Sequence, residues 1–505
     1  MGQPTSPAPS RMAQYATLTA ALLGWMFDGF EMGLFPVIGK PALKDLLTDQ
    51  TQLDRWFAVI MAVFLVGAAS GGVLFGWLGD KIGRVRAMSL SILTYALLTG
   101  MCGFATQAWQ IAVLRFIASL GMGGEWSLGV ALVNEIWPGK SRAFIAGLIG
   151  AASNVGFLLV ALLSMGLSNV VERVETLLLA VGLSQQLTDT LLQNSAWRFL
   201  MISGAFPALL IFFIRLFVPE SSKWEEEHAS GKTSNWSNAD LAGVLVGCLA
   251  AIWIIGAWSP RAADQHPAIS IGITVVGLIV AMGGFLFPVW KYLERTVSSG
   301  ALPAGSAKFV LGRMLLGAGL AGIALLGTWG SIQWAPRWAS ELLPDTETVK
   351  HFAAQKTQIA TALGAIVATI LAAMAAGKFG RRPTYAVLCL GAFASAVYFY
   401  QFHTEFNTQF LIAGFIAGGV TASFYGFFPL YFPELFPTSV RATGQGFSFN
   451  FGRIIAAIGG LQTPTLMAMF GGSFPKAGSL LATIYLAGVF VIWLGPETKG
   501  RELPE

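Results

Sequence analysis

Charged side chains are scarce in this sequence. Only 11% of the 505 residues are Asp, Glu, Lys or Arg, whereas 55% are hydrophobic. A soluble domain carries roughly 25% charged residues, so this chain has too few charges to cover a water-exposed surface. The composition argues against a soluble enzyme, a disordered chain and a nucleic-acid partner. It favours an all-α protein that crosses a lipid bilayer many times.

Cysteine and histidine are also rare. The three cysteines, Cys102, Cys248 and Cys389, lie in apolar stretches, so we interpret them as small buried hydrophobic residues and expect no disulfide framework. The sequence contains no cluster of metal ligands, no nucleotide-binding loop and no arrangement of nucleophile and base. We therefore expect no enzymatic activity, no bound metal and no organic cofactor.

Long apolar segments dominate the chain instead. A membrane-spanning helix needs about 20 mostly apolar residues, and we identify fourteen candidates. They lie at about 14–38, 56–78, 87–106, 109–133, 143–168, 198–218, 241–259, 268–290, 309–334, 356–377, 384–402, 408–432, 443–466 and 476–495. The segments 169–197, 219–239 and 335–355 are amphipathic or polar, and we interpret them as connectors.

The positions of Lys and Arg orient these spans. With the N-terminus in the cytoplasm, 18 of the 31 basic residues fall in cytoplasmic segments and 10 in outer segments. Cytoplasmic loops are enriched in basic residues. We therefore predict a multi-pass protein of the cell inner membrane with both termini in the cytoplasm, and we expect a monomer.

The sequence repeats itself at long range. Glu135 to Arg142 and Glu434 to Arg441 share the pattern E-x-x-P-x-x-x-R, 299 residues apart. Two repeated halves with a binding site between them are typical of secondary transporters. We predict a six-helix bundle at 1–218, a cytoplasmic linker with two inserted helices at 219–306, and a second six-helix bundle at 307–505.

A glycine-rich motif with clustered charges follows the second span. It consists of Gly76, Asp80, Lys81, Gly83 and Arg84, with Arg86 behind them. Glycines permit a tight turn and close helix approach, and an aspartate among basic residues can form ion pairs that latch one conformation. The alternative interpretation is that the charges only fix the topology. The second copy, around Gly380 and Arg381, lacks the aspartate.

This motif closely resembles the cytoplasmic signature of the major facilitator superfamily. The resemblance implies two six-helix bundles that rock about a central site, with a latch formed by Gly76, Asp80, Lys81, Gly83, Arg84, Glu135, Arg142, Arg381, Glu434 and Arg441. The stretches 197–198, 219–224 and 496–500 resemble sugar porters. The fourth span, 436–444 and 450–453 are closer to the sialate/carboxylate:proton symporters, some of which also have fourteen spans.

Several ionisable residues lie inside the predicted spans. Such groups cost about 2.5–3.5 kcal/mol to insert, so each is a functional candidate. Asp28 and Glu31 share a face of the first span, where mutual repulsion favours a proton carrier. Arg115 lies at a similar depth in the fourth span and is the expected partner of Glu31. Glu125 lies nearer the midplane and is a further candidate for proton coupling. A purely structural role for each remains the alternative.

The second half of the chain supplies candidates for substrate binding. Arg453 lies near mid-depth without an obvious acid nearby, and an unpaired guanidinium is a good carboxylate clamp. Asn450, one turn earlier, could assist it. Gln333 and Trp334 lie near the outer end of the seventh core span, with Trp329 one turn before Gln333, and Tyr425 could line the opposite wall. An interfacial aromatic belt is the alternative for the tryptophans.

These observations favour a proton-coupled symporter of a small organic anion, such as a monocarboxylate, a sialate or an aromatic acid. The four histidines lie in connectors or at span ends, so the coupling proton must use carboxylates. A sugar transporter, either proton-driven or facilitative, is the first alternative. A membrane sensor that does not transport is the second.

Overall fold

The computed structural model describes residues 10–137, 141–257, 267–300, 302–303, 305–343 and 350–504. Side chains at 458–465 are outside this description, as is Pro138 of the first repeated motif. Every regular element within the described ranges is a helix. Helices satisfy all of their backbone hydrogen bonds internally, which a chain this apolar requires.

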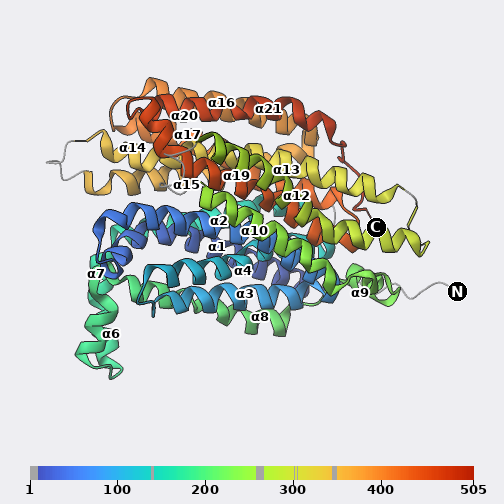
Figure 1. Ribbon diagram of the computed structural model, residues 1–505, viewed down its shortest axis with the longest axis horizontal. Helices are drawn as coiled ribbons and strands as arrows, with labels where there is room; N and C mark the ends of the chain where they lie inside the picture. Colours follow the sequence, from blue (N-terminus) through green and yellow to red (C-terminus); the bar gives the residue numbers. More distant parts are fainter. Residues whose placement is uncertain are drawn as a thin grey trace.

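The first half of the molecule contains the helices that precede the acidic run at 225–227. Most are straight, long and nearly parallel (Figure 1). They are α1 (Arg11–Leu46), α2 (Leu53–Ile82), α3 (Arg84–Cys102), α4 (Ala108–Ile136), α5 (Arg142–Met165), α6 (Leu167–Ala180), α7 (Gln185–Ser203) and α8 (Leu210–Phe217).

An inserted hairpin and a second half follow. The linker and hairpin are α9 (Ser222–Ala229), α10 (Leu241–Ala257) and α12 (Pro267–Ser298). The second half comprises α13 (Ser306–Gly330), α14 (Ala335–Glu341), α15 (Lys350–Phe379), α16 (Arg381–Phe402), α17 (Thr408–Ala422), α18 (Phe424–Tyr431), α19 (Arg441–Met469), α20 (Phe474–Ala482) and α21 (Ile484–Val491). Short 3₁₀ turns join several of them, among them η6 (Ile332–Trp334).

Thirteen helical stretches of the described chain are long and apolar enough to cross a membrane. They match thirteen of the fourteen expected spans. The fourteenth, 443–466, forms the continuous helix α19, and part of its side chains lies outside the described set. The all-α, polytopic fold class is therefore confirmed.

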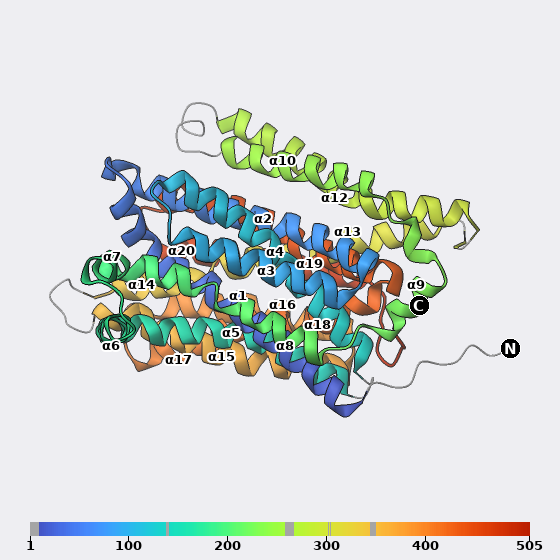
Figure 2. The same cartoon turned by 90° about the horizontal axis from the view of Figure 1, so that it is seen from below.

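The two halves lie side by side, with the termini at one end of the molecule (Figure 1). We call this the termini end and the opposite one the far end. Helices α5 and α2 of the first half pack against α15 and α19 of the second. The α10–α12 hairpin packs against α2 and α13 along one edge of the molecule (Figure 2).

Small residues allow this close packing. A side chain at Gly71 of α2 would meet the Leu120 carbonyl of α4 at 1.9 Å, and one at Gly76 would meet the Ala442 carbonyl of α19 at 2.7 Å. The first contact joins helices within a half, and the second joins the two halves. Small residues at helix interfaces are the usual means of packing spans in a membrane.

The amphipathic connector 169–197 is largely helical. It contains α6 and the start of α7, and α6 runs perpendicular to the bundle at the far end (Figures 1 and 2). A left-handed turn at Asn194, Ser195 and Ala196 redirects the chain. Asp45 at the end of α1 holds this turn, because it accepts hydrogen bonds from Asn194 (2.8 Å) and Trp197 (3.2 Å).

Candidate functional site

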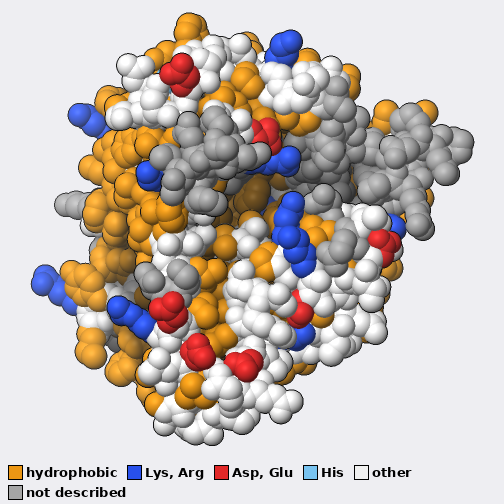
Figure 3. Space-filling view, turned by 90° about the vertical axis from the view of Figure 1, so that its left-hand side faces the viewer, with side chains coloured by type: hydrophobic (Ala, Val, Ile, Leu, Met, Phe, Trp, Pro, Cys, Tyr) orange, Lys and Arg blue, Asp and Glu red, His pale blue; other side chains and the backbone are white. Residues whose placement is uncertain are grey.

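A pocket lies between the two halves. Its empty space, together with the part open to solvent, is about 750 Å³, and it begins at mid-depth beside Trp25 and Arg453. From there it extends past Trp329 to Gln333 and Gln358 near the far end. The far-end surface is hollowed near its middle, where hydrophobic side chains are visible at depth (Figure 3). We call the whole pocket, from Trp25 and Arg453 to the far-end surface, the central pocket.

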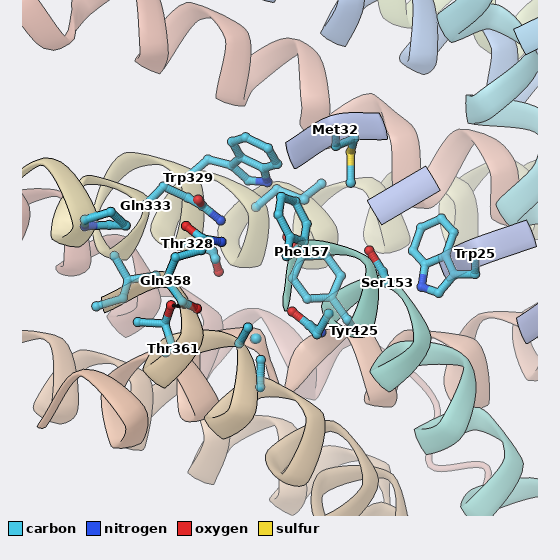
Figure 4. Close-up of a pocket in the computed structure, with 18 of the residues that line it drawn as sticks. Trp25, Met32, Ser153, Phe157, Thr328, Trp329, Gln333, Gln358, Thr361 and Tyr425 are labelled. Carbon is cyan, nitrogen blue, oxygen red and sulfur yellow. Dashed lines mark hydrogen bonds between the residues drawn. The ribbon is translucent and has the colours of Figure 1, made fainter. Parts of the chain in front are cut away.

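Both halves line the central pocket. Trp25 and Met32 of α1 and Ser153 and Phe157 of α5 line the pocket from the first half, and Tyr425 of α18 lies beside Phe157 (Figure 4). Thr328, Trp329, Gln333, Gln358 and Thr361 gather on the far-end side of the pocket. The arrangement combines flat apolar surfaces with a few amides and hydroxyls, which is typical of sites for small organic molecules.

Two donors in the pocket have no partner among the described residues. They are Nε1 of Trp25 and Nη1 of Arg453. Arg453 is only 4% exposed, and its guanidinium lies over the Phe449 ring at 5.4 Å. A buried donor without an acceptor is costly, and a buried guanidinium more so. The central pocket therefore offers an anion two unsatisfied donors, one from each half.

Three of the expected substrate residues lie in the central pocket: Arg453, Tyr425 and Gln333. Two do not. Asn450 points away and donates to the Gly123 carbonyl of α4 at 3.1 Å, which joins the two halves. Trp334 packs near Phe474, because α13 ends at Gly330 and the chain turns there.

Sequence reasoning missed several lining residues. Asn154, Gln358 and Thr361 are polar residues within otherwise apolar spans, and a survey of such positions could have found them. Trp25 carried no such signal, since tryptophan is common in spans. Only the three-dimensional contact between α1 and the second half brings it to Arg453.

The buried acids of the first half separate into two groups. Glu31 forms the expected ion pair with Arg115, at 2.8 Å. Asp28 is within electrostatic range of Glu31, as the shared helix face suggested, but it interacts more strongly with an acid of another helix. Among charged side chains, Glu125 of α4 has the largest effect on Asp28, and Arg453 is also within electrostatic range. The i, i+3 spacing leaves an angle of about 60° between the two side chains, which is enough to direct them to different helices.

A cluster of buried ions closes the termini end. Arg84 binds Asp80 at 2.8 Å and Glu135 at 3.2 Å, and Glu135 also binds Arg441 of the second half at 2.7 Å. Thr443 donates to Asp80 from its backbone N–H (2.8 Å) and its hydroxyl (2.6 Å). We call this set the termini-end cluster. The bonds of Glu135 to Arg441 and of Asp80 to Thr443 join the halves, so these bonds can exist only while this end is closed.

The second repeated motif forms a related but looser cluster. Glu434 pairs with Arg381 of its own half at 2.5 Å, and Arg142 of the other half approaches it to 3.9 Å. Thr498 of the C-terminal segment takes the place of a second close partner, with its hydroxyl 2.6 Å from Glu434. The missing aspartate of the second motif is thus accompanied by a weaker link between the halves.

Of two further predicted latch residues, Lys81 has another role and Gly83 the expected one. Lys81 does not pair with Asp80. It donates to Asn238 of the linker at 2.5 Å and lies over the Trp77 ring at 4.7 Å. Gly83 has a φ of +107°, a conformation that glycine adopts readily, and its position leaves room for the Glu220 carboxylate. The tight turn expected from the glycine is therefore present.

Comparisons with known proteins agree with this architecture. Residues 13–245 and 339–505 match the family described as "Sugar (and other) transporter". The chain is 26% identical to a putative metabolite transport protein of Haemophilus influenzae, over 97% of this chain and 98% of that protein.

Two relatives with more specific names match over shorter stretches. A probable 4-methylmuconolactone transporter of Cupriavidus pinatubonensis is 30% identical over 54% of this chain and 60% of its own length. The sialic acid transporter NanX of Escherichia coli is 28% identical over 44% and 48%. This chain thus covers about half of each.

Among solved structures, the proton:xylose symporter XylE, a major facilitator protein, superimposes with a TM-score of 0.66. It is 17% identical, and the match covers 97% of this chain and 98% of that one. The expected major facilitator fold is confirmed.

Proposed function

The chain belongs to the sugar (and other) transporter family of membrane transporters, and on this premise we propose that it carries a small organic anion together with a proton. The observation that carries the proposal is Arg453, a buried and incompletely paired guanidinium in a pocket shared by both halves. A guanidinium binds a carboxylate with well-defined geometry, and a neutral solute does not need it. Proton coupling is supported by the buried carboxylates Asp28 and Glu125, whereas Glu31 is held in an ion pair by Arg115.

The transport cycle follows from the two ends of the pocket. With the termini-end cluster closed, substrate enters from the far end and reaches Arg453 and Trp25. Rocking of the halves then breaks the bonds of Asp80 and Glu135 to the second half and opens the termini end. We place the protein in the cell inner membrane with its termini in the cytoplasm, so inward proton flow would drive uptake.

Uptake into proteoliposomes under an imposed inward proton gradient tests the proposal. Lactate, sialate, benzoate and glucose would each be supplied with and without an uncoupler. We expect uptake of one acid that depends on the gradient, and at least a tenfold loss in Arg453→Ala because a charged hydrogen bond contributes about 1.5–3 kcal/mol. Arg173→Gln, which alters an exposed arginine on α6, is the matched control. Equal uptake by Arg453→Ala and wild type would refute the assigned site.

Sugar transport is the second candidate. It is favoured by the amides Asn154, Gln333 and Gln358 in the pocket, which suit a solute with many hydroxyls. Glucose uptake that neither the uncoupler nor Arg453→Ala affects would support this candidate over the first.

A further inference from the structure

Two buried carboxyl groups meet beside the central pocket. Asp28 and Glu125 are 0% and 4% exposed, and their side chains interact with each other and, at Glu125, with the Tyr95 hydroxyl, but with no cationic donor at hydrogen-bond distance among the described residues. The Glu125 carboxylate lies against Gly24, where a β-carbon would come within 1.6 Å of its Oε1 atom. Gly24 is one turn before Asp28, so the two acids occupy the same space between α1 and α4.

The groups around this acid pair come from several helices. Glu31 of α1, Tyr95 of α3 and Arg453 of α19 face it electrostatically. Tyr95 is 2% exposed, and its hydroxyl interacts with the Glu125 side chain. Arg453 has an unpartnered Nη1. The acid pair therefore has one cation nearby, and that cation also lines the substrate pocket.

The other embedded acid is in a different situation. Glu31 accepts a 2.8 Å hydrogen bond from Arg115, and the Arg115 guanidinium lies between the rings of Phe35 (4.4 Å) and Phe64 (4.6 Å). Thr99 adds a longer contact to the same carboxylate oxygen, at 3.4 Å. This ion pair is internally neutral and packed by aromatic rings, so substrate binding at Arg453 leaves its charge unchanged.

We propose that Asp28 and Glu125 share one proton in the empty transporter and take up a second proton when a monocarboxylate binds Arg453. Two adjacent buried carboxylates cannot both be ionised, so the empty pair holds one proton and one negative charge, which Arg453 balances. A bound substrate carboxylate takes over Arg453. The remaining negative charge of the pair then lacks a counter-ion, and a proton from the water that fills the pocket forms an O–H bond on it.

This inference rests on the proposed function and makes it more specific. The charge is balanced in both states. In the empty transporter the negative charge of the acid pair balances Arg453, and in the loaded transporter the substrate carboxylate balances it. Each transport cycle therefore carries one proton for each monocarboxylate, and it produces no net current. The Glu31–Arg115 pair acts as a fixed structural element and does not carry the proton.

Proton uptake linked to binding tests the inference. Calorimetric titration of the purified full-length protein in two buffers of different ionisation enthalpy gives the protons bound per ligand. The probe is whichever of lactate, benzoate or sialate shows uptake. We expect one proton per ligand in wild type and none in the double variant Asp28→Asn/Glu125→Gln, which should still bind the probe and exchange it across the membrane. Glu172→Gln, at an exposed acid, is the matched control.

Opposite results would overturn the inference. Retained proton uptake in the double variant, its loss in Glu31→Gln, or a current during monocarboxylate uptake by wild type would each do so. If the double variant does not fold, the single variants Asp28→Asn and Glu125→Gln serve: each leaves one carboxylate that Arg453 balances when the site is empty, so each should still take up one proton per ligand, and loss of uptake in either would overturn the inference. Failure of wild type to bind any of the three acids would instead refute the proposed function.

Discussion

Asp80 offers a sharp test of how the termini end is closed. Its carboxylate, on α2, accepts hydrogen bonds from the backbone N–H groups of Ala442 (3.2 Å) and Thr443 (2.8 Å) and from the Thr443 hydroxyl (2.6 Å). Because α19 begins at Arg441, these are donors of its first turn. Asp80 therefore caps a helix of the other half, and the cap is lost whenever the two halves separate at this end.

The variant Asp80→Asn should favour the state that is open at the termini end. Hydrogen bonds to a charged acceptor contribute about 1.5–3 kcal/mol, and a carboxylate at a helix N-terminus adds about 0.3–1 kcal/mol. Asparagine keeps one acceptor oxygen and loses the charge. We expect a loss of about 2–3 kcal/mol, which changes the ratio of open to closed molecules roughly 30- to 150-fold.

Distances between spin labels at Arg86 on α3 and Phe379 on α15 would measure this change, because both residues are exposed and lie at the termini end on different halves. The long-distance population should rise in Asp80→Asn. Asp240→Asn is the control, since Asp240 pairs with Arg295 within the linker and hairpin. An unchanged distance distribution in Asp80→Asn would show that the cap does not hold this end closed.

Two further predictions concern stability. Burial raises the pKa of Glu497, but hydrogen bonds from backbone N–H groups, foremost that of Arg381, outweigh it and lower the pKa overall. The ionised Glu497 side chain therefore stabilises the fold fully above about pH 4.3, the ordinary pKa of glutamate, and this stability is lost as the pH falls through the lower pKa of the folded state. The melting temperature of Glu497→Gln should be lower than that of wild type at pH 7, and the two should converge in acid. Asp45→Ala removes the acceptor of Trp197 and Arg198, so hydrogen exchange should accelerate at 185–200 while that of α16 stays unchanged.

The spans and the termini-end ion pairs could be predicted because both depend on short-range signals. Long apolar runs identify helices that cross a membrane, and the repeated E-x-x-P-x-x-x-R motif placed Glu135 and Glu434 at equivalent positions. The Glu31–Arg115 pair followed from equal depth in two spans, and the structure contains it. Depth along a helix can be counted from sequence to within a few residues.

Rotation about the helix axis could not be counted in the same way. It decides that Asp28 interacts more strongly with Glu125 than with Glu31, and that Asn450 faces α4 and not the pocket. It depends on how α1, α4 and α19 pack, which includes contacts across the two halves. The end of α13 at Gly330 was missed for a related reason, since the apolar pattern continues through the turn that displaces Trp334.

The inserted hairpin has a mechanical consequence. Helices α10 and α12 are held together by the close approach of Gly243 to Gly284, and they contact α2 of the first half as well as α13 and α19 of the second. A rigid hairpin cannot follow two bodies that tilt in opposite directions. One set of its contacts must slide during each cycle, and the lipid beside that edge must fill and vacate the space. Under the proposed rocking of the halves, the hairpin would thus link the opening of the central pocket to the rearrangement of lipid along this edge.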